Sequence, residues 1–206
     1  MVLRPGWFPE YSPAEQLVFD EVKQIIQANY SQYGFAHIET PAVEANSVLL
    51  AKNGEDAGKQ IFWLYGLAQG NEDTKDYALH FDLTIPFARY VLDWENELTF
   101  PFKRYQIQPV RRGERSQRGR FKEFWQSDID VIWSDEWWVM SDGKWKNLYY
   151  DAEMLVVMAK TLYEIVAKFL ANKPFTLHIN NRYLLAGFFS QFAEKRSLVI
   201  KSITYS

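Results

Sequence analysis

The chain of 206 residues contains no cysteine and no long hydrophobic run. Without thiols it cannot form disulfides, use a cysteine nucleophile or bind zinc through cysteine. No stretch of about 18 apolar residues occurs, so we expect no membrane-spanning helix. The first ten residues include Pro5, Gly6 and Pro9 and lack the apolar stretch of a signal peptide. These absences predict a cytoplasmic protein with no membrane partner.

Aromatic residues, in contrast, are abundant: the chain has 8 Trp, 12 Tyr and 15 Phe. Hydrophobic residues make up 48% and charged residues 24%, which is typical of globular proteins and excludes general disorder. The large side chains can therefore build a core without disulfides. Because no internal repeat or linker is visible, we expect residues 1–206 to form a single domain.

Two long helices and two long strands are predicted. Ser12 begins a helix with a capping pattern, and Gly34 is suited to end it. Residues 151–171 carry a regular apolar stripe, which predicts the second helix. The strands are expected at 102–110 and 121–133. Shorter elements are expected as strands at 35–39, 61–66, 77–81 and 175–179, a turn at 69–76, helices at 84–92 and 182–192, and a hairpin around 141–143. This pattern favours an α+β fold with a mainly antiparallel sheet.

The charge of the chain is unevenly distributed. The segment from Lys103 to Lys122 contains eight basic residues and one acid, Glu114, which gives it a net charge of +7. Since the whole chain carries −3, the remainder carries −10. Bulk attraction to nucleic acid is therefore not expected, but this one segment could bind phosphate. A solvated basic surface is the alternative explanation.

The most informative stretch is Tyr105–Ile132, a predicted strand, a basic loop and a returning strand. Arg112 and Glu114 are two residues apart and share one face of the chain as it leaves the first strand. Alternate residues of the second strand also share a face, and they are a ring, an amide and two carboxylates: Phe124, Gln126, Asp128 and Asp130. Such groups suit a ligand with a phosphate, a flat ring and a cationic amine. A solvated face with paired charges remains open from this pattern alone.

The same stretch resembles motif 2 of class II aminoacyl-tRNA synthetases, in its histidyl-tRNA synthetase form. Further matches support the resemblance. YGFAHIETPAVE at 33–44 is similar to motif 1, and ALHFDLTIPFARYV at 78–91 is similar to a histidyl-specific segment. Residues 151–153 and TLHINNRYLLAG at 176–187 resemble later core segments, so the likeness covers most of residues 10–190. It implies an antiparallel sheet flanked by helices.

The resemblance implies an ATP site with Mg²⁺ neutralising phosphate charge. Arg112 would bind the α-phosphate and stabilise charge during adenylate formation, which makes it the catalytic residue. Glu114 would contact the adenine amino group, and Phe124 would stack on the ring. Arg120, at the end of the loop, would contact the ATP phosphates.

The resemblance also implies a histidine site made by Asp82, Thr84, Gln126 and Asp130, chiefly for the substrate ammonium. Family members commonly have Glu at the position of Asp82 or Asp130, and Asp keeps the charge with a shorter reach. The implied reaction joins histidine to ATP, giving histidyl-adenylate and pyrophosphate, before histidine is transferred to tRNA. Pro41 matches the motif 1 proline at a dimer interface, so a homodimer is implied.

Several family features are not found in this sequence. They are a later histidyl segment of the form RGLDYYTG, motif 3 with its second arginine, and the anticodon-binding domain. We therefore expect a partial catalytic core with weak or absent aminoacylation and with tRNA binding that is weak or lost. Residues Ser134–Tyr149 resemble an insertion.

Two other functions remain open. One is a binding role, as a synthetase-like regulatory subunit of ATP phosphoribosyltransferase, although Arg112, Glu114 and Phe124 argue against it. The other is nucleic-acid binding through the basic segment. No metal site is expected, because the three histidines are far apart in sequence and lack companion ligands: His37, His80 and His178.

Overall fold

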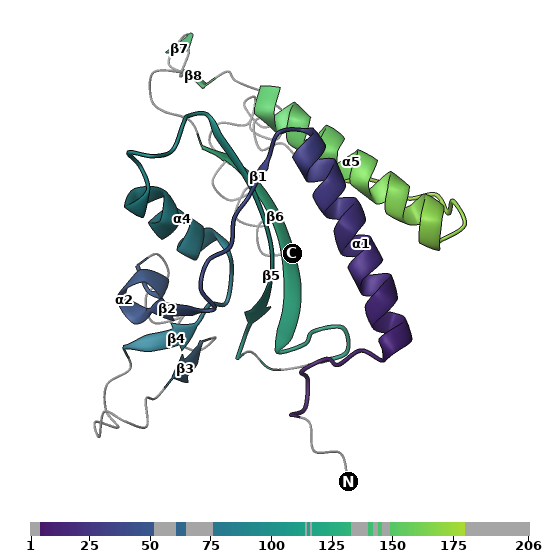
Figure 1. Ribbon diagram of the computed structural model, residues 1–206, viewed down its shortest axis with the longest axis horizontal. Helices are drawn as coiled ribbons and strands as arrows, with labels where there is room; N and C mark the ends of the chain where they lie inside the picture. The colour runs from purple at the N-terminus through teal and green to yellow at the C-terminus, as the bar shows by residue number, and fades with distance from the viewer. Residues whose placement is uncertain are drawn as a thin grey trace, which may run out of the picture. The chain divides into compact units, whose positions relative to one another are not determined.

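Two long antiparallel strands, β5 (Phe102–Arg111) and β6 (Glu123–Ile132), form the centre of the computed structural model (Figure 1). The structure describes residues 5–51, 61–64, 76–113, 115, 117–132, 140–141, 144–145 and 149–179. The chain divides into two compact units, Met1–Ala171 and Asn172–Ser206. All the elements described below belong to the first unit.

The register of β5 and β6 gives the sheet two chemically different faces. Residue pairs run from Phe102 opposite Ile132 to Arg111 opposite Glu123. Because side chains alternate across a strand, the core residues Tyr105 and Ile107 lie on one face, and the polar row that includes Arg104 and Asp130 lies on the other. A short strand, β1 (Ala36–His37), pairs in parallel with β5. Both predicted long strands are thereby confirmed.

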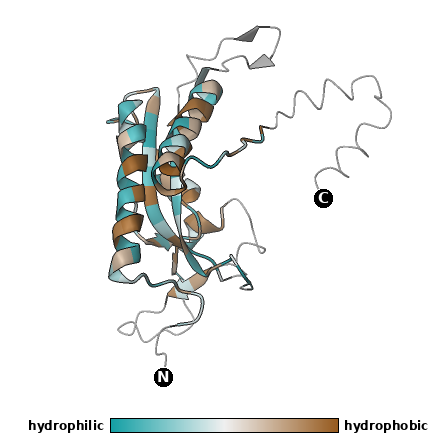
Figure 2. Ribbon diagram, turned by 90° about the vertical axis from the view of Figure 1, so that its right-hand side faces the viewer, coloured by the Kyte–Doolittle hydropathy of each residue, from teal (hydrophilic) through white to brown (hydrophobic). Residues whose placement is uncertain are grey.

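The apolar face packs on two helices, α1 (Pro13–Gln32) and α5 (Tyr149–Phe169), which lie side by side (Figures 1 and 2). Both helices carry hydrophobic and hydrophilic residues, as Figure 2 shows. The buried residues of this core come from the helices, the sheet and the segment that joins α1 to β1; they are Tyr30, Phe35, Tyr105, Ile107 and Val157. Burial of such side chains contributes about 1.5–3 kcal/mol each.

Local sequence fixes both ends of α1. The Ser12 side chain accepts a hydrogen bond from the Glu15 amide at 3.4 Å, and Glu15 accepts one in return from the Ser12 amide at 2.8 Å. These bonds satisfy amides that a helix start leaves unpaired. Gly34 follows the helix with a φ of +78°, which residues with a side chain rarely adopt. The predicted start and end of this helix are confirmed.

A second, smaller sheet packs on two short helices. Its strand order is β2 (Val43–Ala45), β4 (Tyr77–Leu79) and β3 (Phe62–Leu64), all antiparallel. The helices are α2 (Asn46–Leu49) and α4 (Thr84–Asp93). Backbone hydrogen bonds at His80 join this sheet to β5: its amide donates to Ala42, and its carbonyl accepts from Arg111. The segment 80–82 is thereby fixed beside the end of β5.

The remaining predictions had mixed outcomes. Strands β7 (Met140–Ser141) and β8 (Lys144–Trp145) pair, which confirms the hairpin, although most of Ser134–Tyr149 lies outside the described residues. The strand predicted at 175–179 is wrong, because none of these residues is in a strand and an alternating pattern alone supplies no hydrogen-bonded ladder. Helix 182–192 and most of turn 69–76 also lie outside the described part. None of the described helices is long and apolar enough to cross a membrane.

Candidate active site

The candidate site lies on the polar face of the β5–β6 pair, which is the face opposite α1 and α5. Its register places Arg104 opposite Asp130, Gln106 opposite Asp128, Gln108 opposite Gln126 and Val110 opposite Phe124. The predicted alignment of Phe124, Gln126, Asp128 and Asp130 on one face is therefore present. Arg112 follows on the same alternation, just beyond the end of β5.

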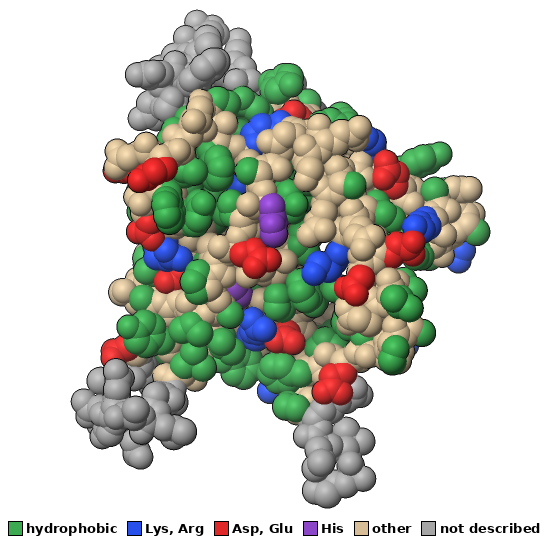
Figure 3. All heavy atoms as spheres, in the orientation of Figure 1, with side chains coloured by type: hydrophobic (Ala, Val, Ile, Leu, Met, Phe, Trp, Pro, Cys, Tyr) green, Lys and Arg blue, Asp and Glu red, His purple; other side chains and the backbone are tan. Residues whose placement is uncertain are grey.

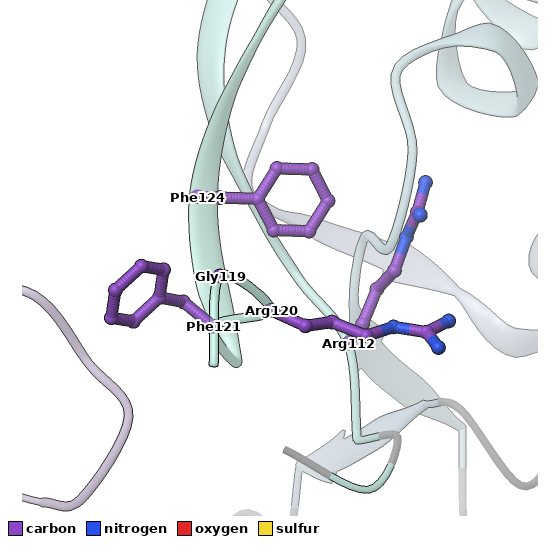
Figure 4. Close-up of a pocket in the computed structure, with 5 residues that line it drawn as sticks. All are labelled: Arg112, Gly119, Arg120, Phe121 and Phe124. Atoms are coloured by element: carbon purple, nitrogen blue, oxygen red, sulfur yellow. The ribbon is translucent and has the colours of Figure 1, made fainter. Parts of the chain in front are cut away.

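A pocket of about 210 Å³ lies at the Arg112 end of this face. It is lined by Arg112, Gly119, Arg120, Phe121 and Phe124. In Figure 4 the Arg112, Arg120 and Phe124 side chains extend to the same side of β6, whereas Phe121 extends to the other. On the side of Arg112 and Arg120, the pocket thus combines two cations with the Phe124 ring, which are the groups that bind phosphate and a base.

Arg112 is held in place by backbone groups from two other segments. Its Nε donates to the Phe81 carbonyl at 3.0 Å, and its amide donates to the Lys122 carbonyl at 2.8 Å. Its guanidinium carbon lies 5.0 Å from the centre of the Phe124 ring. The β4–α4 connection and the start of β6 therefore set the direction of this side chain before any ligand binds.

The loop between β5 and β6 closes in a tight turn. Gln117 and Arg120 exchange backbone hydrogen bonds, and Gly119 takes a φ of +81° between them. Glycine suits this left-handed conformation because it has no Cβ. The turn brings Arg120 to the pocket, whereas Glu114 lies outside the described residues.

A cluster of charged groups occupies the other end of the face. The Asp128 carboxylate interacts electrostatically with Asp82, Asp130, Arg104 and Arg112. Burial raises the pKa of Asp128, the two neighbouring carboxylates add to that rise, and the two arginines oppose it. Burial also raises the pKa of Asp130, against the opposing effect of Arg104. Three carboxylates against two guanidiniums favour a cationic ligand here.

Gln126 lies on β6 between the pocket and the charged cluster. Its Oε1 is buried and has no hydrogen-bond partner in the described part of the chain. A buried acceptor without a partner is costly, so this oxygen is suited to receive a donor from a ligand. Asp82 accepts from the Ile85 amide at 3.2 Å, which fixes it at the start of α4, and Thr84 is the exposed first residue of that helix.

Sequence reasoning missed a buried polar row on β5. Gln106 Nε2 donates to Thr40 Oγ1 at 2.8 Å, and Gln108 Nε2 donates to the Thr40 carbonyl at 2.9 Å. Arg104 and Gln106 are fully buried. The available signal was a polar residue at every second position (Arg104, Gln106, Gln108) in a strand whose intervening residues, Tyr105 and Ile107, are in the core.

His80 has a structural role in the described geometry. It is fully buried, and its Nε2 donates to the Pro109 carbonyl at 2.9 Å. Burial lowers the pKa of this ring. The bond ties the segment before Asp82 to β5, so His80 supports the site without lining the pocket.

Part of the positive charge of the basic segment, residues 103–122, is neutralised by neighbouring carboxylates. Between described residues, ion pairs join Lys103 to Glu153 at 2.9 Å, Arg104 to Asp130 at 2.5 Å and Arg111 to Glu123 at 2.6 Å. Figure 3 shows acidic and basic side chains interspersed over the face in view. Nucleic-acid binding by bulk charge is therefore poorly supported.

The chain was compared with known proteins, and no family model matches it. It is 40% identical to the histidine–tRNA ligase of Stenotrophomonas maltophilia, over 94% of this chain and 41% of that relative. It is also 40% identical to the Clostridium tetani histidine–tRNA ligase, over 97% of this chain and 41% of that relative. The chain thus spans about two fifths of the length of the curated relatives it matches.

Solved structures give the same likeness. The histidyl-tRNA synthetase from Nostoc sp. PCC 7120 superposes with a TM-score of 0.62 and 38% identity, covering 77% of this chain and 33% of that chain. An ATP phosphoribosyltransferase regulatory subunit/histidyl-tRNA synthetase from Bacillus halodurans also gives 0.62, at 20% identity, over 80% of this chain and 38% of that one. At that identity the second match supports the fold alone.

Proposed function

We propose that this chain, a homologue of the histidine–tRNA ligases with the α+β fold of a class II aminoacyl-tRNA synthetase core, binds ATP and histidine on the polar face of β5 and β6. The reaction it would serve joins the two as histidyl-adenylate and releases pyrophosphate. Transfer of histidine to tRNA would follow. The observation that carries this proposal is one sheet face with a cation–ring pocket at one end and a carboxylate cluster at the other.

Each end of the face suits one substrate. At the pocket, Phe124 would stack on adenine while Arg112 and Arg120 meet the phosphates, and Glu114 would contact the adenine amino group. The loop turn that carries Arg120 is already closed, so little ordering is needed there. Magnesium would be bound through the ATP phosphates, because no group of three or more acidic or histidine side chains within the described ranges could hold a metal.

At the cluster, Asp130 and Asp82 would bind the ammonium of histidine, with Thr84 and the unpartnered Gln126 oxygen as further contacts. The histidine carboxylate would then attack the α-phosphorus, forming a phosphorus–oxygen bond as the bond to pyrophosphate breaks. Arg112 lines the pocket and also interacts with Asp128 of the cluster, so it would stabilise the charge that develops on the α-phosphate oxygens. Removing one preorganised contact of this type typically lowers the rate by about 10²–10³.

The proposal includes tRNA and a second copy of the chain as partners, and a cytoplasmic location. Support for a homodimer comes from the match of Pro41 to the motif 1 proline and from the surface around it. Pro41, Ala42 and Val43 are consecutive exposed apolar residues. Sedimentation equilibrium of the chain and of Val43→Glu tests the dimer: the wild type should sediment as a dimer and the variant as a monomer.

Calorimetric titration of ATP and histidine tests the proposal directly. Arg112→Ala should weaken ATP binding and leave histidine binding nearly unchanged, whereas Asp130→Asn should do the reverse. Failure of the wild-type chain to bind either ligand would overturn the proposal. Histidine binding without ATP binding, together with capture of a phosphoribosyltransferase, would support the regulatory role instead.

A further inference from the structure

Arg104 is a fully buried cation immediately beneath the proposed histidine site. Its side chain has 0% exposure, and its Nη2 lies 2.5 Å from Asp130 Oδ2. Its Nη1 donates to Gln106 Oε1 at 3.2 Å, and its guanidinium carbon lies 4.1 Å from the centre of the Phe87 ring on α4. The guanidinium is thus fixed by contacts from three elements, β5, β6 and α4.

The burial of this charge is costly, and the fold alone does not require it. The Arg104 Nε has no hydrogen-bond partner in the described part of the chain, and burial lowers the pKa of the guanidinium. Replacing buried ion pairs with apolar residues of similar volume is often neutral or stabilising. The charge at this position therefore points to a role in what it contacts, which is Asp130.

The Asp130 carboxylate is shared between the interior and the site. Its side chain is 39% exposed, so it meets the buried guanidinium on one side and remains accessible on the other. Asp128 on β6 interacts electrostatically with both members of the pair, and it also interacts with Asp82 before α4 and with Arg112 after β5. Without Arg104, three carboxylates would be left with Arg112 as their one cationic neighbour in this cluster.

We propose that Arg104 is a positioning residue that holds the Asp130 carboxylate in place to bind the amino-acid substrate. This inference rests on the proposed function, because the substrate itself is part of that proposal. The geometry of the arginine is set from behind by the Gln106 amide, whose Nε2 donates to Thr40 Oγ1 at 2.8 Å. The polar row of β5 is therefore a support for the histidine site, and Arg104 contacts no substrate.

Arg104→Met tests the proposal, with Lys103→Met as the matched control. Lys103 directly precedes Arg104 in β5, so its side chain lies on the opposite face of the strand. There it pairs with Glu153 at 2.9 Å, and its Nζ lies 4.6 Å from the centre of the Phe35 ring. Both substitutions remove a cation, an ion pair and a cation–ring contact. Histidine binding is measured by calorimetry from pH 4 to 8, and the Asp130 carboxyl is titrated by carbon NMR in the same proteins.

Arg104→Met should weaken histidine binding about tenfold to a hundredfold, since the ion pair that holds the Asp130 carboxylate is lost. It should also move the pKa of Asp130, and with it the acid limb of histidine binding, upward, because Arg104 opposes the rise that burial causes. Lys103→Met should change neither. Unchanged binding and an unchanged Asp130 pKa in Arg104→Met would overturn the positioning role.

Two further results keep the outcomes separate. If the wild-type chain binds no histidine, the proposed function fails, while the Asp130 titration still reports whether Arg104 controls that carboxylate. If Arg104→Met does not fold, Arg104→Lys is used in its place. The retained charge should leave the acid limb of histidine binding unchanged, whereas the loss of the planar guanidinium should weaken histidine binding. Wild-type affinity in Arg104→Lys would then contradict the requirement for a fixed guanidinium.

Discussion

The guanidinium of Arg112 lies over the ring of Phe124, with 5.0 Å between its central carbon and the ring centre. Arg112 follows the last residue of β5, and Phe124 is the second residue of β6. The antiparallel register, which places Val110 opposite Phe124, brings the two together. The cation proposed to meet phosphate and the ring proposed to meet adenine are thus close enough to contact one nucleotide. This relationship makes the two contributions separable by mutation.

Phe124→Leu should weaken ATP binding about tenfold to a hundredfold, because stacking on an aromatic ring contributes about 1–3 kcal/mol per base. Binding of inorganic tripolyphosphate, which has no base, should remain unchanged. Competition of both ligands with a fluorescent ATP analogue measures the difference. The control is Trp125→Leu, an aromatic residue on the opposite face of β6 that contacts Phe19. Equal losses for ATP and tripolyphosphate would argue against stacking at Phe124.

Leu49→Ala should lower the free energy of unfolding by about 2–5 kcal/mol, since it leaves a cavity at a fully buried side chain. Leu49 packs with Ile61, Ala78 and Phe81, next to the segment that carries Asp82. Leu92→Ala is the matched control, because Leu92 is 70% exposed and its removal should change stability by less than about 0.5 kcal/mol. Urea denaturation followed by circular dichroism compares the two. Similar losses in both variants would contradict the expected cavity cost at Leu49.

Ser12→Ala should lower the free energy of unfolding by about 1 kcal/mol through loss of the helix cap. It should also change the acid dependence of stability. Hydrogen bonds from the Ser12 side chain and backbone hold the pKa of Glu15 below its ordinary value of 4.5. The contribution of Glu15 is therefore fully present above pH 4.5 and is lost as the pH falls below it. Denaturation midpoints at pH 7 and pH 3 should differ less in the variant than in the wild type.

His80 should make the protein less stable in mild acid. Because burial lowers the pKa of this ring below its ordinary 6.5, the unfolded chain binds a proton there that the folded protein resists. The free energy of unfolding should consequently fall as the pH drops through 6.5. His80→Gln keeps a donor for the Pro109 carbonyl, so its stability should depend less on pH between 7.5 and 5.5. A variant as pH-sensitive as the wild type would assign the acid effect to other groups.

The local elements of this protein follow from short patterns in its sequence. The capping pair of Ser12 and Glu15, the φ-permissive Gly34 and the alternation from Phe124 to Asp130 depend on neighbours one to four residues away. Physical rules for caps and alternating strands therefore identify them before any fold is known. The same rules failed at 175–179, where alternation is present but the residues do not form a strand, because a strand also needs a partner for its hydrogen bonds.

By itself, the sequence determined helices α1, α4 and α5, the long strands, the polar face of β6 and the resemblance to histidyl-tRNA synthetases. Tertiary structure alone decided which charges meet. Arg104 and Asp130 are 26 positions apart, and the strand register places them 2.5 Å apart with Phe87 of α4 against the guanidinium. The reason is that ion pairing and burial depend on distances across strands and between layers, which no pattern of neighbouring residues encodes.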